Sequence, residues 1–161
     1  MIYRAIGVMS GSSLDGLDLV YASFASKGPH WQYEIHASTC LDYSDEWTQK
    51  LSGADQLSSM AYLQLHVDYG CYLGNQIKKF MNDHGLEYKV QMIASHGHTV
   101  FHQPENGLTH QLGDGASIAA ITGIPVISDL RSMDVALGGQ GAPIVPIGEK
   151  NYSAIIPCFL T

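Results

Sequence analysis

The chain has 161 residues, a formal net charge of −7 and a 45% apolar share, which is typical of a globular protein. Its eight Lys and Arg residues form no basic stripe, so we expect neither nucleic acid nor an anionic membrane as a partner. The three cysteines are widely spaced and odd in number, which predicts reduced thiols and a cytoplasmic location. The sequence contains no signal-peptide pattern and no apolar run near the roughly 20 residues that cross a bilayer.

The beginning of the chain predicts a β-hairpin, because two apolar runs flank a turn made of glycine, serine and aspartate. Gly11 and Gly16 allow a positive φ and a close approach of a ligand to the main chain. Successive N–H groups in such a turn form a concave anion site, which suits a polyphosphate. Asp15 and Asp18 fit beside that anion if Mg²⁺ lies between them and the phosphates. An ordinary polar hairpin turn is the alternative, and a Walker A motif is absent from the sequence.

The next segment predicts a third strand and a short helix. Strict alternation of apolar and polar residues over 31–41 is typical of an antiparallel strand. Ser44 is expected to cap a helix that runs through Leu51 and ends at Gly53.

A longer helix is predicted from the spacing of apolar residues between Leu57 and Met81, with Asp55 as its expected N-cap. Two glycines in its interior, Gly70 and Gly74, indicate close packing on the sheet. His66 in the same helix is interpreted as a half-buried packing residue.

The second half of the chain alternates between strand and helix patterns. Strands are expected at 89–94, 109–112 and 124–128, with a small-residue helix at 116–121 and a glycine-rich loop at 138–143. Three strands, then helices, then this alternation predict an α/β fold with a mixed sheet flanked by helices.

Histidines gather between the strands, at positions 96, 98, 102 and 110. Three imidazoles with an open position can hold a hydrolytic zinc ion. Gly97 indicates a turn rather than a strand between the first two, and the alternative is a loop that donates hydrogen bonds to a polar ligand.

Two carboxylates stand beside glycines in this half. Asp114 precedes the small-residue helix, where an N-cap is the simplest interpretation. Asp134 precedes the glycine-rich loop, where a carboxylate can act as a general base or as a cap or surface charge. Arg131 lies one helical turn earlier, where it is expected to keep Asp134 ionised or to hold an anionic substrate group.

Four segments resemble, in order, the motifs of the anhydro-N-acetylmuramic acid kinase family: Met9–Asp18, Ser95–His102, Gln111–Asp114 and Asp134–Pro143. The resemblance extends to about Pro146. It implies membership of the sugar kinase, Hsp70 and actin superfamily, in which two RNase H-like domains close on nucleotide and substrate. Residues 1–146 would then form an RNase H-like (actin-like ATPase) domain, and residues 147–161 a tail leading to an absent second domain.

The activity implied by the resemblance is an ATP-dependent kinase reaction. Such enzymes open 1,6-anhydro-N-acetylmuramic acid with water and phosphorylate O6, giving N-acetylmuramic acid 6-phosphate in cell-wall sugar recycling. The implied ATP-binding residues are Gly11, Ser12, Ser13, Leu14, Asp15, Gly16, Leu17 and Asp18, with Mg²⁺ held through Asp15 or Asp18. Asp134 matches the catalytic base, and the residues expected near the sugar are Ser10, His96, Thr99, Gln111, Asp114 and Arg131.

The chain departs from the family pattern in two side chains and in length. Ser12 replaces the usual Thr, and His98 replaces the usual Gln. Because family members are roughly twice as long, we expect an N-terminal half that is inactive alone, and either a homo-oligomer or a C-terminal half as partner. The alternatives are a non-catalytic module that binds nucleotide or sugar, and a zinc hydrolase that uses the histidines.

Overall fold

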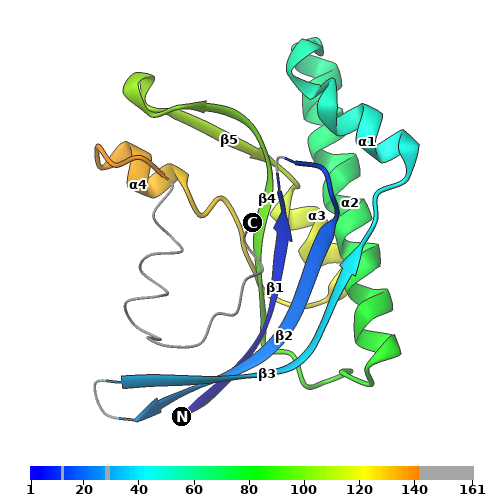
Figure 1. The fold of residues 1–161 in the computed structure, drawn as a ribbon, viewed down its shortest axis with the longest axis vertical. Helices are drawn as coiled ribbons and strands as arrows, with labels where there is room; N and C mark the ends of the chain where they lie inside the picture. The colour runs from blue at the N-terminus through cyan, green and yellow to red at the C-terminus, as the bar shows by residue number, and fades with distance from the viewer. Residues whose placement is uncertain (12, 28–29, 142–161) are drawn as a thin grey trace.

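A computed structural model describes residues 1–11, 13–27 and 30–141 of the chain (Figure 1). Outside the described residues lie Ser12, residues 28–29 ahead of the third predicted strand, and residues 142–161, which include the end of the glycine-rich loop and the predicted tail 147–161.

The strands form one open, twisted, mixed sheet in the order β3-β2-β1-β4-β5, with β6 also paired to β4. The pairs β1/β4 and β4/β6 are parallel, and the pairs β1/β2, β2/β3 and β4/β5 are antiparallel. The strands are β1 (Ile2–Ser10), β2 (Leu17–Lys27), β3 (His30–Leu41), β4 (Met92–Gln103), β5 (Leu108–Leu112) and β6 (Val126–Ile127). The predicted α/β class, with an antiparallel start of three strands, is confirmed, and the arrangement is consistent with an actin-like ATPase domain.

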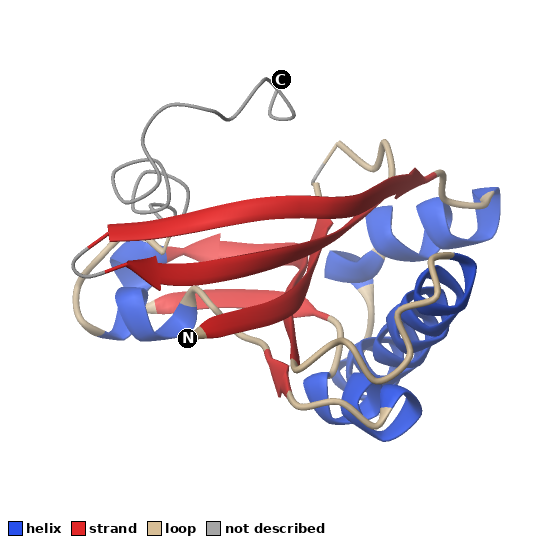
Figure 2. Cartoon of the chain, turned by 90° about the horizontal axis from the view of Figure 1, so that it is seen from below, coloured by secondary structure: helices blue, strands red, loops and turns tan. Residues whose placement is uncertain are grey.

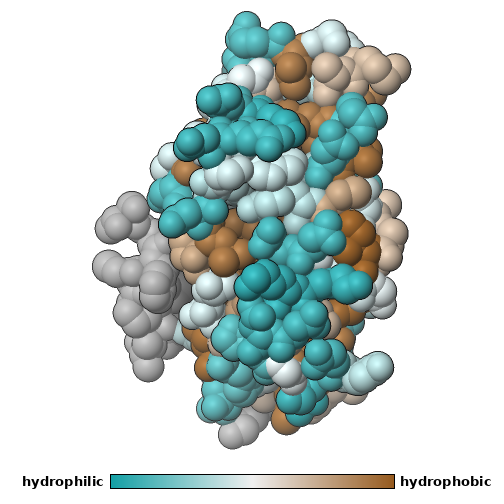
Figure 3. Space-filling view, turned by 90° about the vertical axis from the view of Figure 1, so that its right-hand side faces the viewer, coloured by the Kyte–Doolittle hydropathy of each residue, from teal (hydrophilic) through white to brown (hydrophobic). Residues whose placement is uncertain are grey.

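The helices divide unequally between the two sides of the sheet. The helices α1 (Asp45–Ser52), α2 (Ser59–Asp83) and α3 (Gly115–Thr122) pack on one side, whereas α4 (Ser132–Ala136) lies on the other (Figures 1 and 2). Two short 3₁₀ helices, η1 (Ala54–Gln56) and η2 (Pro104–Asn106), complete the described elements. Over α1 and α2 the outer surface is mainly hydrophilic, with hydrophobic side chains showing between polar ones (Figure 3).

The core lies between the sheet and α2. Alternation along β1 places Ile6 and Val8 on the helix side, where they join Ile93 of β4 and Leu73 and Ile77 of α2 in one buried cluster. Ser10 continues the same face of β1, so this strand delivers a buried hydroxyl to the end of the apolar core.

The predicted N-cap of the short helix is confirmed, and that of the long helix is wrong. Ser44 accepts a hydrogen bond from the Trp47 amide, and the helix ends at Gly53 as expected. The cap of α2 is Ser58, which accepts from the Ala61 amide, while Asp55 lies in η1. Serine competes well with aspartate at this position because both side chains offer an acceptor to the free amides of the first turn.

The two glycines of α2 allow close packing, but on α3 rather than on the sheet. A Cβ at Gly70 would lie 2.6 Å from the Asp114 carbonyl oxygen and 2.8 Å from its nitrogen. A Cβ at Gly74 would lie 3.0 Å from the Ile121 side chain. The predicted target was wrong because the atoms that face these glycines belong to α3 and its cap, namely Asp114, Ser117 and Ile121.

The histidine-rich segment is part of a strand, which corrects the expected turn at Gly97. β4 runs from Met92 to Gln103, so it also starts later than the predicted residue 89. Gly97 keeps φ +71° within the strand, and a Cβ there would collide with the Leu112 carbonyl oxygen of β5. The pairing of β4 with β1 shifts register between Ser95 and His98, across Gly97, and its pairing with β5 shifts between Thr99 and Phe101; both shifts are typical of β-bulges.

Within the described residues no helix is both long and apolar enough to span a membrane.

We expect Gly70→Ala to lower the free energy of unfolding by about 1–3 kcal/mol, because the new methyl group meets the backbone of Asp114, which cannot move aside cheaply. Urea unfolding measures the change. Asn75→Ala, at an exposed position of the same helix, is the control and should be neutral or slightly stabilising. An equal increase in the free energy of unfolding in both variants would show that the contact between α2 and α3 is looser than described.

Candidate functional site

The hairpin tip between β1 and β2 is the predicted phosphate turn. The Leu14 amide donates to the Gly11 carbonyl at 3.3 Å, and Leu14 itself has φ +58°. Ser13 and Asp15 are exposed, whereas Gly16 is buried. Gly16 packs so closely that a Cβ there would lie 2.7 Å from Cys40 Sγ. Tight packing of this glycine fixes the base of the turn and leaves its tip open to a ligand.

The two carboxylates of the turn face solvent and are available to a cation. Asp15 lies close to the backbone, with an oxygen 3.6 Å from the position of a Cβ on Gly11. Asp18 accepts a hydrogen bond from Cys40, and this contact raises the pKa of the thiol to about 11. One or two carboxylates suffice for Mg²⁺ when phosphates supply further oxygens, so the residues present fit the cation. Leu17 differs, because its side chain is buried in the core and only its backbone can face a ligand.

A buried chain of hydrogen bonds supports the turn from below. The Tyr43 hydroxyl donates to Ser10 Oγ at 2.8 Å and lies 2.6 Å from the Tyr69 hydroxyl. Ser10 Oγ also lies 3.1 Å from His98 Nδ1. Ser10, His98 and Tyr69 are 2%, 4% and 0% exposed, so three elements, β1, β4 and α2, are joined by polar groups shielded from water.

Burial sets the protonation of this chain. It lowers the pKa of His98, with a smaller lowering from nearby His96, while the Gly11 carbonyl acts in the opposite direction. Burial also raises the pKa of Tyr43 and of Tyr69. All members are therefore neutral near pH 7, and His98 links Ser10 to the carbonyl of the first turn residue.

A second polar cluster lies where α4 meets β4 and β5. Arg131 donates to Thr99 Oγ1 at 3.0 Å and to the Gly141 carbonyl at 2.6 Å, and it lies 3.3 Å from His102. Thr109 Oγ1 accepts a hydrogen bond from the side-chain Nε2 of Gln111 at 2.8 Å. The Gln111 Oε1 atom is buried and has no hydrogen-bond partner among the described residues, so an acceptor is left for a ligand.

Asp134 lies in the first turn of α4, just ahead of the glycine-rich loop, which is the position that the sequence predicted. Its carboxylate accepts from the Gly141 amide at 2.7 Å, and a Cβ on Gly139 would collide with it. The loop therefore folds over the carboxylate. Arg131 contacts β4 and the loop instead of this group, so its expected pairing with Asp134 is not found among the described residues.

Strand β4 connects the two clusters. His98 contacts Ser10 beneath the turn, and the next residue, Thr99, contacts Arg131 at the start of α4. His96 lies on the same strand, half-buried, with its Nδ1 3.0 Å from the Gly97 carbonyl. Burial lowers its pKa, and the Arg131 charge lowers it further. The predicted residues Ser10, His96, Thr99, Gln111 and Arg131 are thus brought to one end of the sheet.

The histidines have separate partners, and no group of three or more metal-binding side chains is found in the described part of the chain. His102 contacts Thr109 and Arg131, and His110 lies 2.7 Å from the Tyr62 hydroxyl. His66 is half-buried, as predicted, and accepts from the Gly113 amide at 3.2 Å.

Asp114 is the N-cap of α3, as its position predicted. It accepts from the Ala116 and Ser117 amides, and the Ser117 hydroxyl lies 2.5 Å away. These hydrogen bonds lower the pKa of the carboxyl group. Both carboxylate oxygens already have partners within the helix.

Sequence reasoning missed Tyr43 and Tyr69. Tyr69 is an ordinary apolar position in the helical pattern, and Tyr43 stands alone between a strand and a helix cap. A tyrosine in a core needs a partner for its hydroxyl, but the sequence does not identify that partner.

We expect His98→Gln to reduce the loss of stability on acidification. Because the folded-state pKa of His98 is lowered, the unfolded chain binds a proton that the folded chain excludes, and stability falls as the pH drops through the unfolded value of 6.5. Melting temperatures measured between about pH 7.5 and about pH 5.5 test this. His84→Gln, at an exposed site after α2, is the control and should keep the wild-type slope. An unchanged slope in His98→Gln would contradict the buried, neutral state of His98.

Comparison with known proteins identifies relatives of this chain by sequence. The model of the anhydro-N-acetylmuramic acid kinase family matches residues 3–154. An anhydro-N-acetylmuramic acid kinase from Brucella canis is 38% identical over 164 residues, covering 96% of this chain and 43% of the relative. Relatives of the same name from Pseudoalteromonas translucida and Acinetobacter baylyi are 36% and 39% identical, covering 91% and 88% of this chain. The matches extend over 40% and 37% of the length of these two relatives, so this chain spans less than half the length of the relatives it matches. By sequence, this chain belongs to the anhydro-N-acetylmuramic acid kinase family.

Proposed function

We propose that this chain is the N-terminal half of an ATP-dependent kinase that opens 1,6-anhydro-N-acetylmuramic acid and phosphorylates O6. The product is N-acetylmuramic acid 6-phosphate, an intermediate in cytoplasmic recycling of cell-wall sugars. Family membership supports the class of reaction, and the chain's short length relative to its relatives suggests that it is inactive alone.

The observation that carries the proposal is the connection through β4. Adjacent residues His98 and Thr99 contact Ser10 under the turn and Arg131 at the start of α4. A kinase must hold the phosphoryl group that it transfers close to the side chain that activates the acceptor. A strand that joins the phosphate turn to the helix bearing Asp134 provides this proximity on a rigid element.

In this proposal the turn binds ATP through its backbone. The amides around Gly11 and Ser13 face the phosphates, and Ser12 adds a hydroxyl. Asp15 or Asp18 holds Mg²⁺, which supplies charge neutralisation to the phosphates when bound. Ser10 is buried and engaged by Tyr43 and His98, so we assign it to supporting the turn.

Asp134 is the proposed general base. Its carboxylate accepts the proton of a water molecule as the water oxygen bonds to the anomeric carbon. The bond from that carbon to O6 breaks, and O6 takes the γ-phosphoryl group of ATP with ADP as the leaving group. The hydrogen bond from the Gly141 amide holds one carboxylate oxygen and leaves the other for the water.

The sugar-facing groups are proposed on the same end of the sheet. The unpartnered Gln111 Oε1 is an acceptor for a sugar hydroxyl, and Thr99 and Arg131 lie next to it in the polar cluster. Arg131 suits the lactyl carboxylate of the substrate, since a guanidinium binds carboxylates through paired hydrogen bonds. His96 lies on the adjoining part of β4, whereas Asp114 acts from its capped position by orienting α3.

We also propose that a partner completes the nucleotide site, either a C-terminal half or a second copy of the chain. An apolar groove of about 430 Å³ lies on the sheet and is lined by residues of β1, β2, β3 and β4. Such a surface is typical of a position covered by another unit.

We expect Asp134→Asn to lower turnover by at least about a hundredfold in the complete two-half enzyme, because the amide keeps the shape but cannot take a proton. ADP release measures turnover, and calorimetry with the sugar should show nearly unchanged affinity. Asp129→Asn is the control, since Ser132 of the same segment is the only hydrogen-bond partner of this carboxylate among the described residues. Near-normal turnover in Asp134→Asn, with a loss in Asp114→Asn, would assign the base to Asp114. Sugar binding without ADP release in the wild type would indicate a non-catalytic module.

The 161-residue chain alone should bind MgATP only weakly, because it offers the phosphate turn without adenosine contacts from a second half. Each 1.4 kcal/mol of missing contact weakens binding by about tenfold. Low-micromolar binding by calorimetry would show that the second half is not needed.

A further inference from the structure

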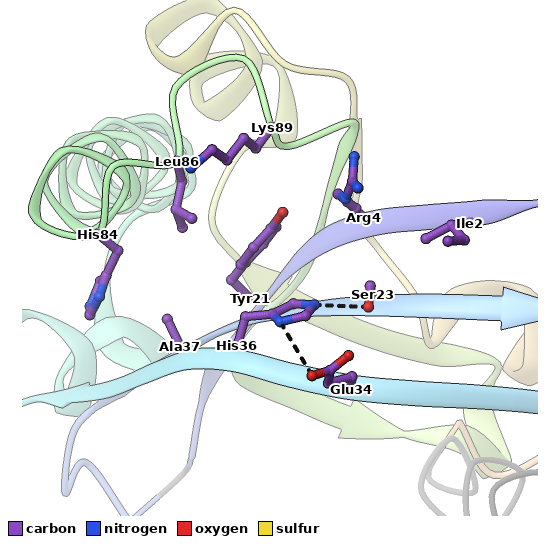
Figure 4. A pocket seen from close by; sticks show the side chains of 10 residues that line it. All are labelled: Ile2, Arg4, Tyr21, Ser23, Glu34, His36, Ala37, His84, Leu86 and Lys89. Atoms are coloured by element: carbon purple, nitrogen blue, oxygen red, sulfur yellow. Dashed lines mark hydrogen bonds and ion pairs between the residues drawn. The ribbon is translucent and has the colours of Figure 1, made fainter.

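A second pocket lies on the helix-covered face of the sheet, beyond the end of α2 (Figure 4). Its volume is about 670 Å³, within the range of sites that hold small organic ligands. It is lined by Ile2, Arg4, Tyr21, Ser23, Glu34, His36, Ala37, His84, Leu86 and Lys89. β1, β2 and β3 supply one wall, and the loop after α2 supplies the other.

This pocket is separate from the proposed kinase site. Arg4 and Ser10 are six residues apart on one extended strand, which corresponds to about 20 Å. Ser10 supports the phosphate turn at the end of β1, whereas Arg4 lies near its beginning. A ligand in this pocket therefore does not overlap a nucleotide bound at the turn.

Two cationic side chains line the pocket, although the whole chain carries a net charge of −7. Lys89 uses one of its three donors on the Gly85 carbonyl at 2.7 Å, and no other partner of its ammonium group is found among the residues that the structure describes. The Arg4 guanidinium has no hydrogen bond or ion pair within the described part of the chain. The one lining carboxylate, Glu34, lies 4.0 Å from His36 and is mostly exposed.

Hydrogen bonds join the two segments that carry these cations. The Arg4 amide donates to Gln91 Oε1 at 2.8 Å, and the Gln91 amide donates to the Arg4 carbonyl at 2.9 Å. Because Lys89 is two residues from Gln91, this double contact fixes the loop of Lys89 against the strand of Arg4. The segments that carry the two cations are thus held side by side, and both side chains are exposed at the mouth of the pocket.

Further polar side chains and an apolar wall accompany the charges. The Tyr21 residue is buried, but its hydroxyl points into the space between Lys89 and Arg4 (Figure 4). His36 Nε2 lies 2.8 Å from the Ser23 hydroxyl, and its ring lies 5.4 Å from the ring of Tyr21. Leu86 and Ala37 supply apolar surface beside them.

We propose that this pocket binds a phosphate monoester with a hydroxylated body, of the size of a hexose phosphate. Two cations suit a ligand with two negative charges, such as a phosphate monoester, better than they suit a ligand with a single carboxylate. The volume greatly exceeds that of a phosphate ion, so the ligand needs a body. The hydroxyls of Tyr21 and Ser23 and the imidazoles of His36 and His84 can hydrogen-bond such a body, while Leu86 and Ala37 pack against its carbons.

Calorimetric titration of the 161-residue chain with glucose 6-phosphate tests the proposal. We expect saturable binding, with glucose, gluconate and inorganic phosphate each weaker because they lack the dianion or the body. Arg4→Gln and Lys89→Gln should each weaken binding by about tenfold, the effect of one charge-assisted hydrogen bond. Lys79→Gln is the matched control, since Lys79 pairs with Asp83 on the surface of α2 and does not line the pocket.

Three outcomes would overturn the proposal. The first is a lack of saturation at millimolar ligand in a chain whose melting temperature is normal. The second is equal binding by Arg4→Gln, Lys89→Gln and wild type. The third is displacement of the sugar phosphate by MgATP together with insensitivity to Arg4→Gln, which would assign the phosphate to the hairpin turn instead. None of these readouts depends on kinase turnover, so failure here and failure of the proposed function are distinguishable.

Discussion

The buried hydrogen-bond chain of Tyr69, Tyr43, Ser10 and His98 is the constraint on which the candidate site depends. Polar groups in a dry interior are costly unless each finds a partner, so their mutual geometry is tightly restricted. Ser10 ends β1 and begins the turn, and it can satisfy both Tyr43 and His98 in only a narrow range of positions. The core thereby positions a turn that is itself mostly exposed.

The same arrangement explains the length and irregularity of β4. Its first part pairs with β1 and β6, and its later part pairs with β5. The bulges beside Gly97 let one strand serve both halves of the sheet while His98 faces the buried chain and Thr99 faces Arg131. In any strand these two neighbouring side chains point to opposite faces of the sheet. The bulges additionally bend the strand and so change the direction in which each side chain points.

Asp134 and Asp114 show how environment separates two similar carboxylates. Both are near glycines and near the start of a helix. Asp114 has two helix amides and a serine hydroxyl as partners, which is a complete structural role. Within the described residues Asp134 accepts from one amide of the loop folded over it, and no second partner is found for its carboxylate. This difference supports Asp134 as the base in the proposed reaction.

The sequence alone predicted the fold class, the hairpin, the capped short helix and the four ordered motifs. These features are local: alternation sets strands, a serine before an acidic turn sets a helix start, and glycines mark the turn. The family follows from the same linear motifs, because they are contiguous in the chain.

Only the tertiary structure decided which groups meet. Gly70 and Gly74 face α3 instead of the sheet, Gly97 continues a strand, and Arg131 contacts Thr99 instead of Asp134. Each of these depends on pairing between residues many positions apart, which side-chain periodicity does not encode. Tyr43 and Tyr69 are invisible in the sequence for the same reason, since a hydroxyl finds its partner only when strand, helix and loop close around one buried volume.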